Sequence, residues 1–289
     1  MWLDADDTVS PETVRELIKL KEELDPSTDV VMMKYATGFD SKGRTTFSYY
    51  RERLLKNHHG FTWRGRVHEA VTPTGQIIYT DIEIRHKKEG EGDKDRNLRI
   101  YEAMLKDGEA LEPRHQFYYA RELYYHGRYE DAIQALEGFL KEPEAWIENK
   151  IDACLHLAYC HEKLGRQEDA MKALTESFAY DKPRGEACCE LGKLKMDTGK
   201  LSEAVYWYEQ ALSLDPDEQS GAFVQKDCYG YLPSIQLCVC HDRLGDHRRA
   251  YYYHQKSQKF KPDSEAVKLN QAYFERILKQ KVEAVPPKQ

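Results

Sequence analysis

The sequence predicts a chain in two parts: an α+β segment over residues 1–110, then an all-α solenoid of helix pairs over residues 111–279. A glycine-to-alanine pattern that recurs four times predicts the solenoid. Runs rich in Val, Ile, Thr, Tyr and Phe, separated by turn residues, predict strands before residue 90. Residues 280–289 are expected to form a disordered tail.

The repeat is marked by a glycine that is followed five residues later by an alanine. The successive alanines lie 38, 34 and 46 residues apart, and the ideal tetratricopeptide period is about 34 residues. We therefore predict a tetratricopeptide-like array of about four helix pairs over residues 113–262, with a capping helix over residues 264–278. The marker pairs are Gly127 and Ala132, Gly165 and Ala170, Gly199 and Ala204, and Gly245 and Ala250.

The unit over residues 183–216 shows the physical logic of the repeat most clearly. Gly192 is small enough to let two helices approach closely, and Tyr208 is expected to fill the groove between neighbouring units. Gly199 supplies the positive φ that often ends a helix. The stretched linker over residues 217–227 is either a long loop or a helix extension.

Arrays of this kind usually present a concave face that holds a peptide or another domain. Aromatic residues on the predicted helices could form such a face. Aromatic side chains at helical spacing more often pack between helices, and that interpretation is favoured here. The residues concerned are Tyr124, Tyr125, Tyr206, Trp207, Tyr251, Tyr252 and Tyr253.

The chain opens with a predicted strand at residues 1–3, an acidic turn and a helix that begins with Ser10 as N-cap and Pro11 in its first turn. Further strands are expected around residues 30–34, 44–55, 61–71 and 76–86, and a helix over 94–106. The turn carries Asp4-x-Asp6, whose oxygens are ligands of the kind that Mg²⁺ or Mn²⁺ takes. The alternative is a solvated loop whose acids favour the following helix N-terminus.

Trp2-Leu3-Asp4-Ala5-Asp6-Asp7 resembles the Asp-x-Asp segment of family 2 glycosyltransferases of the GT-A fold. The runs Arg53-Leu54-Leu55-Lys56-Asn57 and Phe61-x-Trp63-x-Gly65-x-Val67-His68-Glu69 resemble the acceptor-side half of a bacterial subgroup, in which tetratricopeptide repeats follow the transferase. The resemblance covers residues 1–110 and implies the C-terminal half of a GT-A domain. It implies an inverting, metal-assisted transferase with a nucleotide-sugar donor and a glycan or protein acceptor.

The resemblance also implies residue roles. Asp4 and Asp6 would face the donor diphosphate through Mn²⁺ or Mg²⁺, with Asp6 the more direct ligand and His68 a further ligand or an acceptor contact. Arg53 belongs to a basic cluster that either steers the anionic donor or forms a solvated strand face. Glu69 would be the base that deprotonates the acceptor, or else a strand residue in a surface salt bridge. His86 is a lesser candidate for the work of His68.

The GT-A domain places roughly a hundred further residues before its Asp-x-Asp, in line with how doubly wound sheets are built. We therefore expect this chain to be inactive as a transferase. The alternative function is a non-catalytic tetratricopeptide scaffold for a peptide or protein.

Composition narrows the remaining function classes. A net charge of -7 disfavours a nucleic-acid partner. No apolar run reaches the roughly 20 residues of a transmembrane helix, and we expect a cytoplasmic protein. The seven cysteines include no Cys-x-x-Cys pair, so they are interpreted as buried, reduced packing residues rather than zinc ligands or disulfides.

Overall fold

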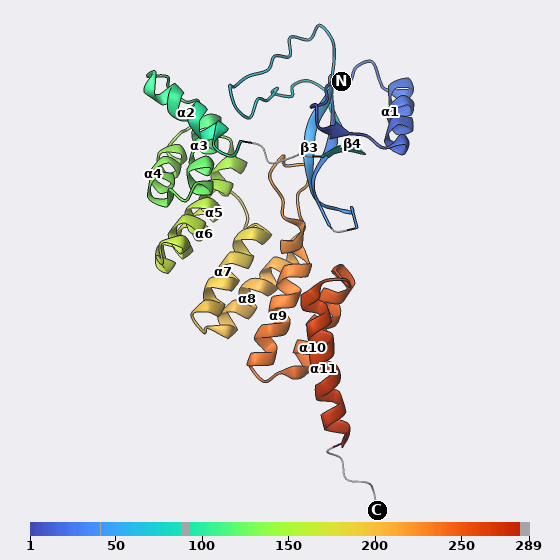
Figure 1. Cartoon of the computed structure of the whole chain (residues 1–289), viewed down its shortest axis with the longest axis vertical. Coiled ribbons are helices and arrows are strands. Elements are labelled where there is room, and N and C mark those ends of the chain that lie inside the picture. The colour runs from blue at the N-terminus through green and yellow to red at the C-terminus, as the bar shows by residue number, and fades with distance from the viewer. Residues whose placement is uncertain (41, 88–92, 284–289) are drawn as a thin grey trace, which may run out of the picture. The chain divides into compact units, whose positions relative to one another are not determined.

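The computed structural model describes residues 1–40, 42–87 and 93–283, with side chains as far as residue 277 (Figure 1). The chain divides into two compact units. Unit 1 consists of Met1–Arg166 together with the later segment Asp217–Val224. Unit 2 consists of Gln167–Pro216 and the residues from Gln225 onward. The predicted domain boundary at residues 110/111 stays a prediction.

Unit 1 contains a four-stranded sheet in the order β1-β4-β2-β3. Strand β2 is antiparallel to β3 and parallel to β4, and β1 is antiparallel to β4. The β2 run Val-Val-Met-Met is buried on both faces, as a central strand requires. Its strands are β1 (Asp7–Thr8), β2 (Val30–Phe39), β3 (Thr45–Leu55) and β4 (Ile77–His86).

Helix α1 (Pro11–Glu23) packs Leu17 and Leu20 against the cluster formed by β2 and β4. Its predicted N-cap is confirmed, because the Ser10 hydroxyl accepts a hydrogen bond from the Thr13 N–H at 3.1 Å. Helix α2 (Arg96–Lys106) also lies within the range expected for it. Local sequence signals were therefore sufficient to predict where both helices lie in the chain.

Two expected strands are absent, and these predictions were wrong. Residues 61–71 form a loop with one isolated bridge between Arg64 and Ala70. Gly65 (φ +102°) and His68 (φ +53°) adopt left-handed backbone conformations there, which a strand cannot accommodate. Residues 1–3 are also not a strand. The sheet is entered only after the acidic turn, which closes with a hydrogen bond from the Asp7 N–H to the Asp4 carbonyl at 3.0 Å.

The helices that follow lie along the chain in the order that the repeat pattern predicts. Unit 1 contains α3 (Pro113–Tyr125), α4 (Tyr129–Leu140) and α5 (Ile147–Lys163). Unit 2 contains α6 (Gln167–Glu176), α7 (Gly185–Asp197), α8 (Leu201–Ser213), α9 (Tyr231–Arg243), α10 (His247–Phe260) and α11 (Glu265–Glu283), with short 3₁₀ turns at Ser177–Ala179 and Lys226–Tyr229. Across the described parts of the chain, no helix is both long and apolar enough to cross a membrane.

The four repeat glycines confirm the turn prediction. Gly127, Gly165, Gly199 and Gly245 have φ values of +73°, +74°, +73° and +82°. Each follows the first helix of a pair, where the left-handed conformation ends the helix without a Cβ clash. The seven cysteines are buried, as expected for packing residues. Helix α11 runs beyond its predicted end at residue 278, and residues 284–289 of the predicted tail lie outside the described residues.

Close packing of α7 on α8 depends on Gly192. A Cβ at this position would lie 2.8 Å from the ring of Tyr208, which is only 1% exposed. Tyr208 therefore fills a space within its own repeat, and its cluster extends to Leu237 on α9. Burial raises the pKa of the Tyr208 hydroxyl, which stays protonated.

We predict that Gly192→Ala destabilises the protein by about 1–3 kcal/mol, because the added methyl group forces the Tyr208 ring to move. The matched control is Gly138→Ala in α4, where nothing lies within 4 Å of the added Cβ. That change should stabilise by about 0.5–1 kcal/mol, since alanine is the better helix former. Urea unfolding followed by circular dichroism measures both. A Gly192→Ala protein as stable as the parent would contradict this packing.

Candidate functional site

The acidic turn and the end of β4 bring three possible metal ligands together. The register of β1 on β4 places Asp7 opposite His86. Ligand atoms of Asp6, Asp7 and His86 all lie within 4.8 Å of one another. His86 Nδ1 is 3.4 Å from Asp6 Oδ1 and 3.7 Å from Asp7 Oδ1. The sheet register, rather than closeness in sequence, creates this cluster.

A buried ion pair supports the cluster from behind. Arg53 Nη1 donates to Asp7 Oδ2 at 2.8 Å, and both side chains are 0% exposed. The Arg53 guanidinium lies 4.0 Å from the ring centre of Trp2 and 4.3 Å from that of Tyr35. Aromatic faces stabilise a desolvated cation in this way. The ion pair and the two rings together fix the position of the acidic turn on the sheet.

Tyr35 connects the ion pair to His86. Its hydroxyl lies 2.8 Å from His86 Nδ1. Burial raises the pKa of Tyr35, and the nearby Asp7 carboxylate raises it further. The hydroxyl is therefore neutral and able to donate to the imidazole nitrogen.

The donor set of this cluster fits a divalent cation in part. Asp7 Oδ1 is buried and has no hydrogen-bond partner among the described residues, so it is a ready ligand. Asp6 is 39% exposed and leaves the cluster open to solvent. Two carboxylate oxygens and an imidazole suit Mn²⁺ better than Mg²⁺, which prefers oxygen ligands alone. Two contacts act against this fit. The Arg53 cation offsets the charge of one carboxylate, and the Tyr35 hydroxyl bonds the same His86 Nδ1 that would bind the metal.

The residues predicted from the transferase resemblance do not all meet here. Asp6 belongs to the cluster. Asp4 contributes its backbone N–H, which donates to Asp7 Oδ2 at 2.9 Å, while its carboxylate is outside the three-residue set. Arg53 is fully covered, so a donor phosphate could reach its guanidinium only if Trp2 moved. The sequence did not single out Asp7, although it directly follows Asp6 in the acidic run.

His68 and Glu69 lie on the loop over residues 61–71. His68 Nε2 is 3.3 Å from Glu122 Oε1, and its ring stacks on Tyr118 with centroids 4.3 Å apart. Burial disfavours the charged form of Glu122, but hydrogen bonds from His68 and Asn97 outweigh it and lower its pKa. Glu69 is exposed. The predicted ligand role of His68 and base role of Glu69 stay predictions.

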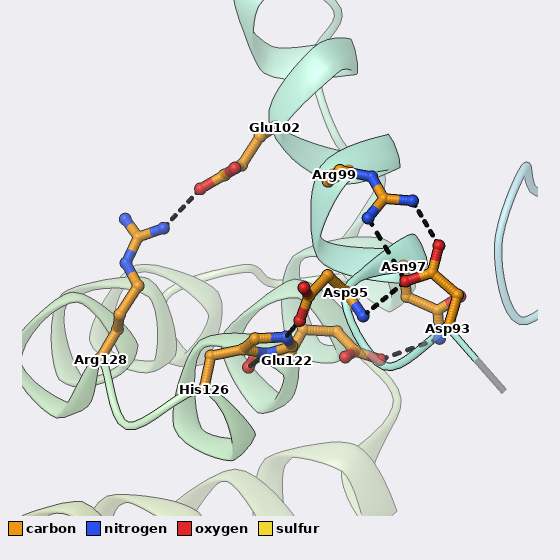
Figure 2. A network of polar contacts seen from close by, with 8 residues as sticks. All are labelled: Asp93, Asp95, Asn97, Arg99, Glu102, Glu122, His126 and Arg128. Atoms are coloured by element: carbon orange, nitrogen blue, oxygen red, sulfur yellow. Dashed lines mark hydrogen bonds and ion pairs between the residues drawn. The ribbon is translucent and has the colours of Figure 1, made fainter. Parts of the chain in front are cut away.

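A polar network joins the start of α2 to the end of α3, and Figure 2 shows its side chains directed toward one another. His126 Nδ1 bonds the Glu122 carbonyl at 2.7 Å, and its Nε2 lies 3.0 Å from Asp95 Oδ1. The carbonyl contact raises the pKa of His126, and Asp95 adds to the shift. Arg99 pairs with Asp93 in the same network. Because these groups satisfy one another, the network fastens α2 to α3 rather than offering a reactive site.

Unit 2 contains an open hollow of about 510 Å³ between α6, α7 and α8. Its surface is mainly apolar, and Tyr206 and Trp207 meet edge-to-face with centroids 5.1 Å apart. Lys195 Nζ pairs with Glu203 Oε2 at 2.6 Å across it. The lining residues are Met171, Thr175, Leu191, Lys195, Ser202, Glu203, Tyr206 and Trp207.

The sequence named two of these residues, Tyr206 and Trp207, as possible face residues. It missed Met171 and Leu191. On each of α6, α7 and α8, the lining residues are spaced four apart, so the sequence places the lining residues of one helix on the same face of that helix. Which faces of different helices enclose a hollow depends on packing that such spacings do not specify. Of the seven aromatics considered, Tyr125, Tyr206 and Tyr252 are strongly exposed, whereas the other four are partly buried.

Two segments match models of the tetratricopeptide repeat, residues 151–183 and residues 185–218. The repeat prediction is thereby confirmed for these segments. No curated protein matches the chain significantly.

Several solved structures are similar to the chain. MamA has a TM-score of 0.46 at 19% identity, covering 58% of this chain and 82% of that one. Pseudomonas aeruginosa pilF has a TM-score of 0.44 at 17% identity, covering 62% and 72%. YrrB, described as a TPR protein with an unusual peptide-binding site, has a TM-score of 0.45 at 17% identity, covering 62% and 84%.

We predict that Asp7→Ala lowers the free energy of unfolding by about 3–5 kcal/mol, because it leaves the Arg53 cation buried without its counterion. Asp6→Ala is the matched control, since its carboxylate is partly exposed and does not pair with Arg53. The control should cost about 1 kcal/mol or less. Urea unfolding of both variants measures the difference, and equal losses would show that the buried pair has no special role.

Proposed function

We propose that this protein is a tetratricopeptide scaffold that binds a peptide segment of a partner protein in the hollow of unit 2. The observation that supports this most directly is the position of the hollow. Helices α6, α7 and α8 that form it lie within the segments that match the repeat models. Its volume of about 510 Å³ is within the usual range for binding pockets.

The lining indicates what kind of segment would bind. Lys195 and Glu203 neutralise each other, so the hollow has little net charge with which to select an ion. Met171, Tyr206 and Trp207 offer apolar surface, and burying such surface is the main favourable term in association. The Ser202 hydroxyl can bond the backbone of a bound peptide, and the Thr175 hydroxyl, whose proton is donated to carbonyls of α6, can still accept from a peptide N–H. A peptide with one or two large apolar side chains fits this combination.

We predict that a peptide selected for the hollow loses at least about 2 kcal/mol of binding free energy, roughly 30-fold in affinity, when Trp207 is changed to alanine, because tryptophan side chains often dominate interface energy. Random 12-residue peptides displayed on phage would be selected on the parent chain and counter-selected on Trp207→Ala. Circular dichroism would confirm that the variant is folded.

Trp63→Ala provides the control, because Trp63 is 49% exposed but lies on unit 1. Peptides that survive counter-selection should bind this control as tightly as the parent. If the counter-selection removes every peptide, the hollow does not bind peptides and the proposal is wrong.

A second candidate function is a part in sugar transfer from a nucleotide donor, by a transferase domain of which this chain would carry the C-terminal half, and the cluster of Asp6, Asp7 and His86 favours it. In this proposal Asp4 and Asp6 face the donor diphosphate, and a bound Mn²⁺ or Mg²⁺ would neutralise it as a leaving group. Exposed Glu69 would take the proton of a glycan or protein acceptor. Because Arg53 is buried against Asp7, its proposed part is to hold the acidic turn in place rather than to contact the donor.

We predict that Mn²⁺ binds the parent chain and that Asp6→Asn and His86→Ala each weaken binding at least about tenfold, since even residues that only support a metal ligand contribute 10- to 100-fold. Titration calorimetry with MnCl₂ measures this. Asp4→Asn distinguishes the two possible ligand sets: unchanged affinity assigns the metal to Asp6, Asp7 and His86, whereas a similar loss assigns it to Asp4-x-Asp6. Absence of Mn²⁺ binding to the parent would contradict the transferase proposal.

A further inference from the structure

A segment from the middle of the repeats belongs to unit 1. Asp217–Val224 lies between α8 and α9 in sequence, yet it packs with the sheet and with α3. In Figure 1 it is part of the orange loop beside β3. The segment contains neither helix nor strand. It is the insertion that stretches the spacing between the third and fourth repeats.

Phe223 anchors the segment. Its ring meets Tyr49 of β3 edge-to-face, with centroids 5.3 Å apart at an interplanar angle of 77°. The Arg121 guanidinium of α3 lies 4.9 Å from the centre of the same ring. Arg121 is held in position by a hydrogen bond from its Nη2 to the Tyr125 hydroxyl at 2.9 Å. The site therefore presents an aromatic wall and a fixed cation to one aromatic side chain.

Two further contacts lie along the segment. A Cβ at Gly221 would be 3.1 Å from the Trp146 ring, and its φ of +80° is one that glycine adopts easily. Glu218 lies near Lys34, whose pKa is raised mainly by its hydrogen bond to Asp81 and further by Glu218. A basic group thus faces the acidic start of the segment, where Asp217 and Glu218 are adjacent.

The segment is held in place by side chains rather than by a backbone ladder. Its described backbone hydrogen bonds close within the segment, as from the Ser220 N–H to the Asp217 carbonyl at 3.4 Å and from the Val224 N–H to the Ala222 carbonyl at 3.1 Å. The Tyr79 hydroxyl approaches the Gln219 carbonyl only at the long distance of 3.5 Å. Segments with few backbone bonds to their surroundings open at low free-energy cost.

We propose that the surface formed by Tyr49, Arg121, Trp146 and Lys34 is a second peptide-binding site, and that Asp217–Val224 is its built-in competitor. The partner is a peptide that carries acidic residues, then a glycine, then an aromatic residue, in the order in which Glu218, Gly221 and Phe223 occur here. The aromatic ring enters between Tyr49 and Arg121, and the acids face Lys34. The site opens when the partner displaces the internal segment.

The test uses the full chain and a labelled peptide. In one variant, residues 217–224 are replaced by eight alternating Gly and Ser residues, which keeps the linker length. The probe is a fluorescein-labelled peptide of residues 215–226, followed by fluorescence anisotropy. The variant should bind the probe at least tenfold more tightly than the parent, because its site has lost the competitor. A probe with alanine in place of phenylalanine should bind the variant at least tenfold more weakly.

Arg121→Ala, made in the Gly/Ser variant, should lower the affinity for the probe by a similar factor. Phe260→Ala on α10 in unit 2 should leave the affinity unchanged. If the Gly/Ser variant misfolds by circular dichroism, the same titration is made on Phe223→Ala, which removes only the anchor. Equal binding to the parent and the opened variant, or binding to neither, overturns the proposal. The site belongs to unit 1 and the hollow to unit 2, so Trp207→Ala tests that proposal independently.

Discussion

The buried pair of Arg53 and Asp7 is the interaction on which the N-terminal part of unit 1 depends. A guanidinium that is 0% exposed is tolerable only if its charge is compensated, here by one carboxylate and by the faces of Trp2 and Tyr35. These partners come from the N-terminal turn and from β2, so the pair fastens the turn to the sheet. The short strand β1 then continues from that turn onto β4, which brings His86 to the acids.

Features that depend on local backbone rules could be predicted from the sequence. Ser10 caps α1 because its hydroxyl meets a free N–H three residues later, and the repeat glycines end helices because they tolerate positive φ. The strand predicted at residues 61–71 is absent because the backbone there adopts a conformation that the residue types do not predict. Its Phe, Trp and Val residues favour a strand, but His68 at φ +53° breaks it. Histidine is enriched at positive φ, yet it adopts that conformation too rarely for the sequence to predict it at one position.

The candidate sites were harder to predict because their residues are brought together over long stretches of chain. Asp6 follows from the acidic run alone, whereas its association with His86 requires the register of β1 on β4. Sequence spacing cannot specify that register, since a shift of one residue would turn His86 to the other face. The unit 2 hollow poses the same difficulty, because Met171, Leu191 and Trp207 come from three helices whose facing surfaces are set by packing.

The two proposed peptide-binding surfaces differ in charge. The hollow of unit 2 has its charges paired internally, so its selectivity rests on apolar fit. The surface around Arg121 places a cation over an aromatic ring, which favours an acidic, aromatic segment. The net charge of -7 does not prevent an acidic segment from binding there. At physiological salt, charges farther away than the Debye length of about 8 Å are largely screened. Direct contacts of the segment with Arg121 or Lys34 are screened much less. The internal segment meets the same requirement, because Glu218 lies near Lys34 and the Phe223 ring lies beside Arg121. In our proposal, only partners that bind this surface more strongly than the internal segment can therefore occupy it.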